Sequence, residues 1–180
     1  MFLMLLRHTK SSWSEPGMSD HDRTLNDRGR SNAVAMANYI RDVCPLPQMI
    51  ICSSAVRTQE TLAPILTALG DDAPEPFVTR AIYEAPGAAY INQIASGPDG
   101  SNVLVVGHNP TTESLAINLS GGDPRLLGDI ATGYPTGGLT ILEFKDGPWA
   151  DALTQAGTHV GFTAPHLLKK DTVPGRVHLG

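Results

Sequence analysis

Cysteine is scarce in this sequence of 180 residues, which holds only Cys44 and Cys52. Two cysteines give neither the framework of a disulfide-rich fold nor the paired clusters that bind zinc. Cys52 ends the apolar run 49–52, so we expect it to be buried as a small hydrophobic residue. This cysteine usage is typical of a reducing compartment, and we expect a cytoplasmic protein.

Long hydrophobic segments are also missing. The N-terminal run 2–6 is apolar but ends at Arg7, and no basic segment precedes it. It is too short for a membrane span or for the core of a signal peptide. We therefore expect no membrane association.

Positive charge is in short supply: 13 Lys and Arg residues against 18 Asp and Glu residues give a formal net charge of −5. Proteins that bind nucleic acid usually carry a basic face. The composition therefore predicts no nucleic-acid partner. Net charge does not exclude an anion in one local pocket, because a few basic side chains suffice there.

The chain alternates short apolar runs with helical patterns, which predicts an α/β fold with a largely parallel sheet. We expect one domain over residues 1–180, irregular after Lys145, with a tail from about residue 164. Expected strands cover residues 2–6, 49–52, 103–106 and 139–144, the last at an edge or half-exposed because it partly alternates, with weaker ones at 77–78 and 159–163. Expected helices cover residues 26–43, capped by Asn26; 55–69, capped by Ser53 or Ser54; 88–95; and 111–119.

Polar side chains follow the ends of the expected strands. Arg7 and His8 end the first, Arg57 lies one turn beyond the second, Glu84 follows the weak strand and His108 follows the third. Ligands of open parallel sheets bind at the carboxyl ends of the strands, so these five side chains should converge there. Taken singly, each could be an ordinary core or surface residue. Together, two arginines and two histidines favour an anion such as phosphate, which arginine binds through planar paired donors.

These residues also carry a resemblance to a known family. The segment 6–9, Leu-Arg-His-Thr, resembles the Arg-His-Gly signature of the histidine phosphatase superfamily, with Thr9 in place of Gly. Stretches 5–13 and 20–29 resemble its branch of SixA-type phosphohistidine phosphatases. Further matches lie at 52–61, 83–84, 106–110 and 135–139, so the resemblance spans roughly residues 2–165 in the family's order. It implies a three-layer α/β/α sandwich of the phosphoglycerate-mutase type.

The resemblance also implies roles for the five side chains. His8 would be the nucleophile that forms a phosphohistidine intermediate, and Arg7, Arg57 and His108 would surround the phosphoryl oxygens. His108 would be protonated when phosphate is bound, because an anion favours the charged imidazole. Glu84 would protonate the leaving group and later activate water. The resemblance implies no metal and no cofactor.

The substrate stays open at this stage. Only residues 9–25 separate His8 from the first expected helix, which leaves little chain for a lid. An open site favours a phosphohistidine on a phosphotransfer protein. The alternatives are a broad-specificity small-molecule phosphomonoesterase, a mutase, and a catalytically silent module that binds phosphate or a phosphoprotein. More distant is a metal-dependent hydrolase using His8, His21 and His108.

Two further features near His8 have two interpretations each. Trp13 is a candidate stacking surface at the mouth of the pocket, but a packing role explains it equally well. In the stretch 20–29, Arg23, Arg28 and the acidic residues could line the pocket or could hold the loop against the first helix.

Overall fold

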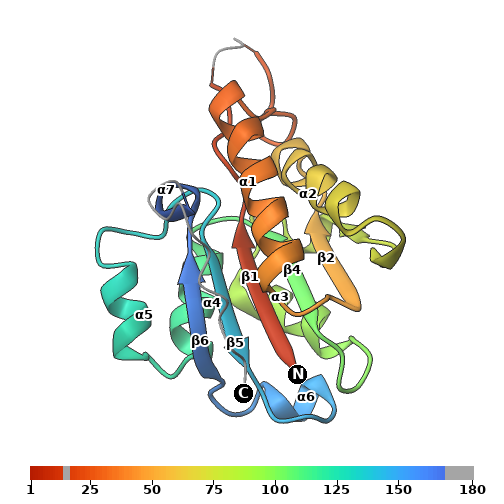
Figure 1. The fold of residues 1–180 in the computed structure, drawn as a ribbon, viewed down its shortest axis with the longest axis vertical. Helices are drawn as coiled ribbons and strands as arrows, with labels where there is room; N and C mark the ends of the chain where they lie inside the picture. Colours follow the sequence, from red (N-terminus) through yellow and green to blue (C-terminus); the bar gives the residue numbers. More distant parts are fainter. Residues whose placement is uncertain (14–16, 169–180) are drawn as a thin grey trace.

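We analysed a computed structural model of the chain, which describes residues 1–13 and 17–168 (Figure 1). The strands are β1 (Phe2–Arg7), β2 (Met49–Ser53), β3 (Phe77–Thr79), β4 (Val103–Gly107), β5 (Leu139–Glu143) and β6 (Thr158–Thr163). The helices are α1 (Asp27–Val43), α2 (Val56–Leu69), α3 (Gly87–Ala95), α4 (Thr111–Leu119), α5 (Pro124–Asp129), α6 (Trp149–Ala152) and α7 (Pro165–Leu168), with single 3₁₀ turns η1 (Gly70–Asp72) and η2 (Arg80–Ile82).

The strands form one sheet in the order β3-β2-β4-β1-β5-β6. Strands β1 to β4 pair in parallel, whereas β5 runs antiparallel to both of its neighbours. The predicted, largely parallel sheet is confirmed. Because β1 lies between β4 and β5, the side chains that follow β1 and β4 emerge side by side at one edge.

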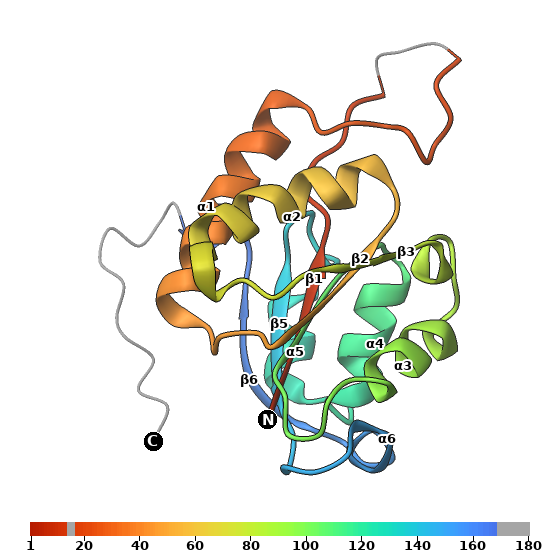
Figure 2. The same ribbon diagram turned by 90° about the vertical axis from the view of Figure 1, so that its right-hand side faces the viewer.

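Helices cover both faces of this sheet (Figure 2), and a cluster of buried apolar side chains lies on each face. Met4 and Leu6 of β1 point to the face covered by α1 and α2, where they join one core cluster. Leu3 and Leu5 point to the opposite face and join the cluster built with α3, α4, α5 and α6. This alternation is what a strand buried on both sides requires. The expected three-layer α/β/α sandwich is confirmed.

The prediction that 139–144 is an edge strand is wrong. Strand β5 is buried except at Glu143, since the weak pattern at 159–163 does form β6 and covers it. Of the two polar residues in this partly alternating pattern, Glu143 is exposed, whereas Thr140 is fully buried. Its hydroxyl lies 2.9 Å from the Tyr134 hydroxyl, and this hydrogen bond permits its burial.

The prediction of an irregular segment after Lys145 is also wrong, because α6, β6 and α7 lie there. Helix α6 has only four residues and begins with Trp149, which is fully buried and donates a hydrogen bond to the Ser101 carbonyl at 3.1 Å. A helix this short shows no periodicity, so tertiary packing decides it. Within the tail expected from about residue 164, 165–168 are helical, and residues 169–180 lie outside the described part.

The predicted N-cap is confirmed for α1 and wrong for α2. Asn26 caps α1 by accepting a hydrogen bond from the Gly29 amide at 2.8 Å, as predicted. Helix α2 begins after Ala55 without a side-chain cap, so neither Ser53 nor Ser54 is its N-cap. The Ser53 hydroxyl lies instead 2.8 Å from Nε2 of His108. Helix α5 was not predicted.

Gly29 sets how closely α1 approaches the segment after His8. A Cβ at this position would lie 2.0 Å from the Lys10 carbonyl oxygen, a rigid backbone atom. We expect Gly29→Ala to lower the free energy of unfolding by about 1–3 kcal/mol, as overpacking does. Gly128→Ala is the control, since nothing lies within 4 Å of its Cβ. Urea unfolding measures the stability of both variants. Equal free energies of unfolding would contradict the close approach of α1 to the Lys10 carbonyl.

Candidate active site

The five side chains that the sequence singles out line one pocket of about 770 Å³. Arg7 ends β1 and is followed by His8, Arg57 is the second residue of α2, Glu84 follows η2, and His108 follows β4. The His8 amide donates a hydrogen bond to the carbonyl of Gly107 at 3.0 Å, which joins the ends of β1 and β4. The predicted convergence at the carboxyl edge of the sheet is confirmed.

The two histidines lie side by side, with ring centroids 5.3 Å apart. Nδ1 of His8 lies 2.7 Å from the Thr9 carbonyl oxygen. Because a carbonyl only accepts hydrogen bonds, Nδ1 must carry the proton, and Nε2 keeps its lone pair. The backbone of Thr9 therefore fixes the tautomer, and a side chain at this position does not prevent it.

Thr9 itself is fully buried, and its amide donates to the Thr61 hydroxyl at 3.1 Å. Its backbone does not adopt a positive φ, since Glu84 is the non-glycine residue with that conformation in residues 1–13 and 17–168. No glycine is required here.

Burial keeps both imidazoles neutral. It lowers the pKa of His8 to about 4, and the positive charges of Arg57 and Arg7 add to this effect. Burial likewise lowers the pKa of His108 to about 3, together with the proximity of His8 and Arg57. A neutral imidazole has the lone pair that a nucleophile needs, so the electrostatics of the pocket suit nucleophilic attack by His8.

These low pKa values predict a stability that depends on pH. An unfolded histidine takes up a proton near pH 6.5, but His8 and His108 in the folded chain do so only near pH 4 and 3. As the pH falls from 6.5, the unfolded state therefore binds more protons, and the folded state loses about 1.4 kcal/mol per proton and pH unit. Urea unfolding at pH 7 and pH 5 measures this loss. Replacing both histidines by asparagine should make it smaller, and an unchanged pH dependence would contradict it.

Arg57 is held by a residue that sequence reasoning did not single out. The Arg57 guanidinium is 7% exposed and contacts Asp20 twice: NH1 donates to its backbone carbonyl, and NH2 lies 2.9 Å from Oδ2. Arg23 and Tyr83 also donate to this carboxylate, at 2.6 and 3.0 Å. Partial burial tends to raise the pKa of Asp20, but the hydrogen bonds from Arg23 and Tyr83 and the charge of Arg57 lower it to about 2.

Arg7 contributes a second guanidinium to the pocket. One of its terminal nitrogens donates to the Tyr134 carbonyl. Its Nε is buried and has no hydrogen-bond partner in the described part of the chain. A buried donor without a partner is costly unless a ligand accepts from it. Arg7 also lines the pocket, and its planar guanidinium is a donor group that suits an anion there.

Glu84 reaches the pocket through an unusual backbone conformation. Its φ is 48°, in the left-handed region that residues with a Cβ seldom adopt. Such conformations cost about 1–3 kcal/mol and cluster at functional sites. The side chain is exposed at the pocket wall and can exchange protons with solvent.

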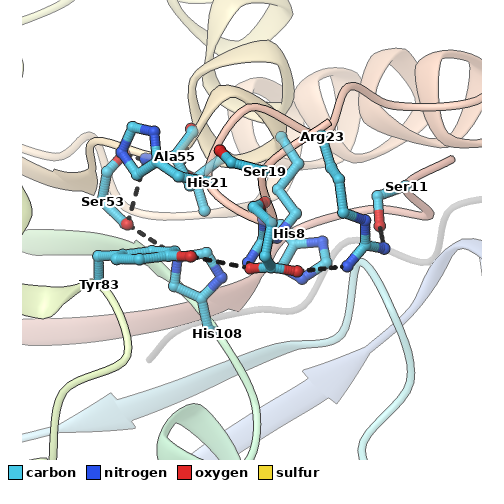
Figure 3. Close-up of polar contacts among 12 residues, drawn as sticks. His8, Ser11, Ser19, His21, Arg23, Ser53, Ala55, Tyr83 and His108 are labelled. Atoms are coloured by element: carbon cyan, nitrogen blue, oxygen red, sulfur yellow. Dashed lines mark hydrogen bonds and ion pairs between the residues drawn. The ribbon is translucent and has the colours of Figure 1, made fainter. Parts of the chain in front are cut away.

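Several described residues between β1 and α1 line the pocket, among them Ser11 and Arg23, whose contact is drawn in Figure 3. Arg23 donates to the Ser11 hydroxyl at 2.6 Å and to the Ser12 carbonyl at 3.0 Å. Its guanidinium also lies 3.3 Å from the ring centroid of Trp13, which is 78% exposed and lines the pocket. Arg23 thus both lines the pocket and contacts the loop residues Ser11, Ser12 and Trp13. Arg28 is exposed on α1 and does not line the pocket.

The three histidines of the metal-site alternative are not brought together. His21 does not line the pocket, and its Nε2 lies 2.9 Å from the Ser54 hydroxyl. Within residues 1–13 and 17–168, no group of three His, Cys, Asp or Glu side chains is placed to hold a metal ion. The same residues contain no helix long and apolar enough to cross a membrane.

Three residues were missed as site residues: Asp20, which lines the pocket, and Ser53 and Tyr83, which hydrogen-bond to the lining residues His108 and Asp20. Ser53 was considered only as a helix cap, Asp20 only as part of a loop, and Tyr83 only within a motif. Their contacts join elements distant in sequence, as in the pairing of Ser53 with His108. The resemblance covers all three residues, in stretches 20–29, 52–61 and 83–84, but it assigned no role to them, and spacing alone does not reveal such contacts.

Comparisons with known proteins agree with this geometry. The family described as "Histidine phosphatase superfamily (branch 1)" matches residues 3–85. A Mycobacterium tuberculosis protein described as uncharacterized, Rv1276c, is 36% identical over 165 residues, which cover 89% of this chain and 99% of that protein. The crystal structure of an Agrobacterium tumefaciens protein provisionally named phosphohistidine phosphatase SixA is 29% identical and has a TM-score of 0.78, with 91% of this chain and 97% of that chain covered. A protein of the same provisional name from Nakamurella multipartitia is 25% identical, has a TM-score of 0.78 and covers 91% and 95% of the two chains.

Proposed function

The chain belongs to the histidine phosphatase superfamily, in its SixA-type branch, and is a phosphatase that acts on a phosphorylated substrate; we propose that its reaction passes through a phosphohistidine at His8. The observation that carries this proposal is the 2.7 Å contact between Nδ1 of His8 and the Thr9 carbonyl. It holds the proton on Nδ1 and leaves Nε2 as the nucleophile.

In the first step, Nε2 of His8 attacks the phosphorus atom, and the bond from phosphorus to the leaving group breaks. Glu84 gives its proton to the leaving group. Arg7, Arg57 and His108 stabilise the negative charge on the three equatorial oxygens, which is the main task in phosphoryl transfer. The bound dianion favours the protonated form of His108 and so opposes the burial that lowers the pKa of this imidazole.

In the second step, water attacks the phosphohistidine, and Glu84 accepts a proton from that water. The bond between Nε2 and phosphorus breaks, inorganic phosphate leaves, and His8 returns to its neutral form. Atoms and charges balance without a further reactant. The exposure of Glu84 lets its proton equilibrate with solvent between turnovers.

We propose a phosphohistidine on a protein as the substrate. Within residues 1–13 and 17–168, no separate domain or long insertion covers the pocket, and the segment between β1 and α1 lines it through Lys10, Ser11, Trp13, Asp20 and Arg23. A histidine on the surface of another protein can therefore approach it. A closed site would instead favour a mutase, which must retain its intermediate. The names of the Agrobacterium and Nakamurella proteins agree with this substrate.

The test is a comparison of substrates. The purified chain is given a phosphotransfer protein phosphorylated on histidine and, separately, a panel of small phosphate esters, with His8→Ala as the control. We expect kcat/KM to be highest for the phosphoprotein and hydrolysis to be lost in the variant. Efficient turnover of a small ester with the phosphoprotein left intact would instead establish a small-molecule phosphomonoesterase. No hydrolysis by the unchanged protein would favour the binding module.

A further inference from the structure

The carboxylate of Asp20 occupies a site built for an anion. Its donors come from three separate parts of the chain: Arg23 in the loop after β1, Arg57 in α2 and Tyr83 after η2. Figure 3 shows Tyr83 and Arg23 approaching this region from opposite sides of His8. Two guanidiniums and a phenol are the donor set that a phosphate or carboxylate of a ligand would use.

The position of Arg57 does not depend on that carboxylate alone. The side chain is buried in the structure, and its NH1 donates to the backbone carbonyl of Asp20. Both features persist when the side chain of Asp20 is changed to an amide. The carboxylate therefore acts chiefly through its negative charge on Arg57 and Arg23.

This charge faces the pocket, because Asp20 is 39% exposed and belongs to the pocket lining. Lys10 and Glu84 are the other charged side chains that line the pocket beside the arginines, and their opposite charges offset one another. Consider a substrate whose phosphoryl group lies on His8 and that carries a second anionic group close to the phosphorus atom. That second group would lie near the Asp20 carboxylate, because His8 and Asp20 line the same pocket. Like charges at short range in a partly desolvated pocket repel.

We propose that Asp20 is a specificity-determining residue that disfavours phosphorylated ligands carrying a second anionic group next to the phosphoryl group. This inference rests on the proposed phosphoryl site at His8 and deepens it. Asp20 occupies the guanidinium donors that a phosphorylated carboxylic acid or a bisphosphate would need. The pocket then accepts one phosphoryl group on an uncharged or cationic carrier, such as the imidazole of a histidine side chain.

Two small ligands test this directly by calorimetry, without any need for turnover. Phosphonoacetate carries a carboxylate next to its phosphonate, and phosphonoacetamide replaces that carboxylate by a neutral amide. We expect the unchanged protein to bind the amide more tightly at low salt. In Asp20→Asn the affinity for the acid, relative to the amide, should increase by about three- to tenfold, and salt should reduce the difference.

The matched control is Asp22→Asn, which removes the same charge from the same loop. The Asp22 side chain is 62% exposed and contacts Ser19 and His21 rather than an arginine of the pocket. Asp22→Asn should change the ratio of the affinities for phosphonoacetate and phosphonoacetamide by less than about twofold. Thermal unfolding checks that each variant folds, and Asp20→Ala provides a second removal of the charge.

The outcomes distinguish a failure of this inference from a failure of the proposed phosphoryl site at His8. If both ligands bind and the ratio is the same in all variants, Asp20 does not determine specificity, and the phosphoryl site stands. A lower affinity for both ligands in Asp20→Asn would mean that the carboxylate only positions Arg57, which also overturns the inference. If neither ligand binds any of the proteins, the phosphoryl site fails and the inference fails with it.

Discussion

Replacing His8 with alanine should lower kcat/KM by about 10⁴-fold or more, because the loss of a nucleophile removes the covalent route. His8 is 9% exposed, and its imidazole hydrogen-bonds to the Thr9 carbonyl. Burial of this imidazole already disfavours its charged form, so the variant should remain folded at neutral pH. Steady-state kinetics with a phosphohistidine protein measure the loss.

His21→Ala is the control for this variant. His21 is a histidine of the neighbouring loop that does not line the pocket. Its replacement should change kcat/KM by less than about tenfold. A comparable loss in both variants would point to a shared metal site of the kind considered from the sequence, and would contradict a nucleophilic role reserved for His8.

Replacing Glu84 with glutamine should have the second largest effect, and its size should depend on the leaving group. An alkoxide needs a proton to leave, so kcat for an alkyl phosphate should fall by about 10²–10⁴-fold, the contribution that a general acid makes. With 4-nitrophenyl phosphate or a phosphohistidine protein, whose leaving groups depart more easily, the fall should be much smaller. Kinetics of one variant with both kinds of substrate measure the contrast.

The matched control is Glu113→Gln, a second carboxylate near the site. Glu113 lies close enough to influence the pKa of Arg7 but does not line the pocket of His8. Any effect of its replacement should therefore be similar for the two kinds of substrate. If kcat of Glu84→Gln falls equally for both kinds of substrate, the role of Glu84 as general acid is contradicted.

The sequence predicts the central part of the fold because its signals are local. The run 2–6 is apolar without interruption, and β1 is buried on both faces as that pattern indicates. Asn26 lies at the start of an amphipathic pattern and caps α1. Strand β5 and helix α6 were misjudged because their environment is tertiary: Thr140 is buried through a hydrogen bond to Tyr134, and α6 is anchored by Trp149.

The same distinction applies to the site. Arg7, His8 and His108 could be placed together because strand ends in a parallel sheet share one edge. The polar contacts around these side chains could not be predicted from the sequence. The hydrogen bond of Ser53 to His108 and the contact of Asp20 with Arg57 join residues far apart in the chain, and their partners depend on how the loops close over the sheet.

A covalent phosphohistidine at His8 is the central claim, and trapping it is the most direct test. The protein is mixed with a radiolabelled phosphohistidine protein, quenched within milliseconds in alkaline denaturant, and digested for peptide mapping. We expect label that is stable to base and labile to acid on the peptide containing His8, and none in His8→Ala. Continued turnover without labelled enzyme, or label on another residue, would contradict the mechanism.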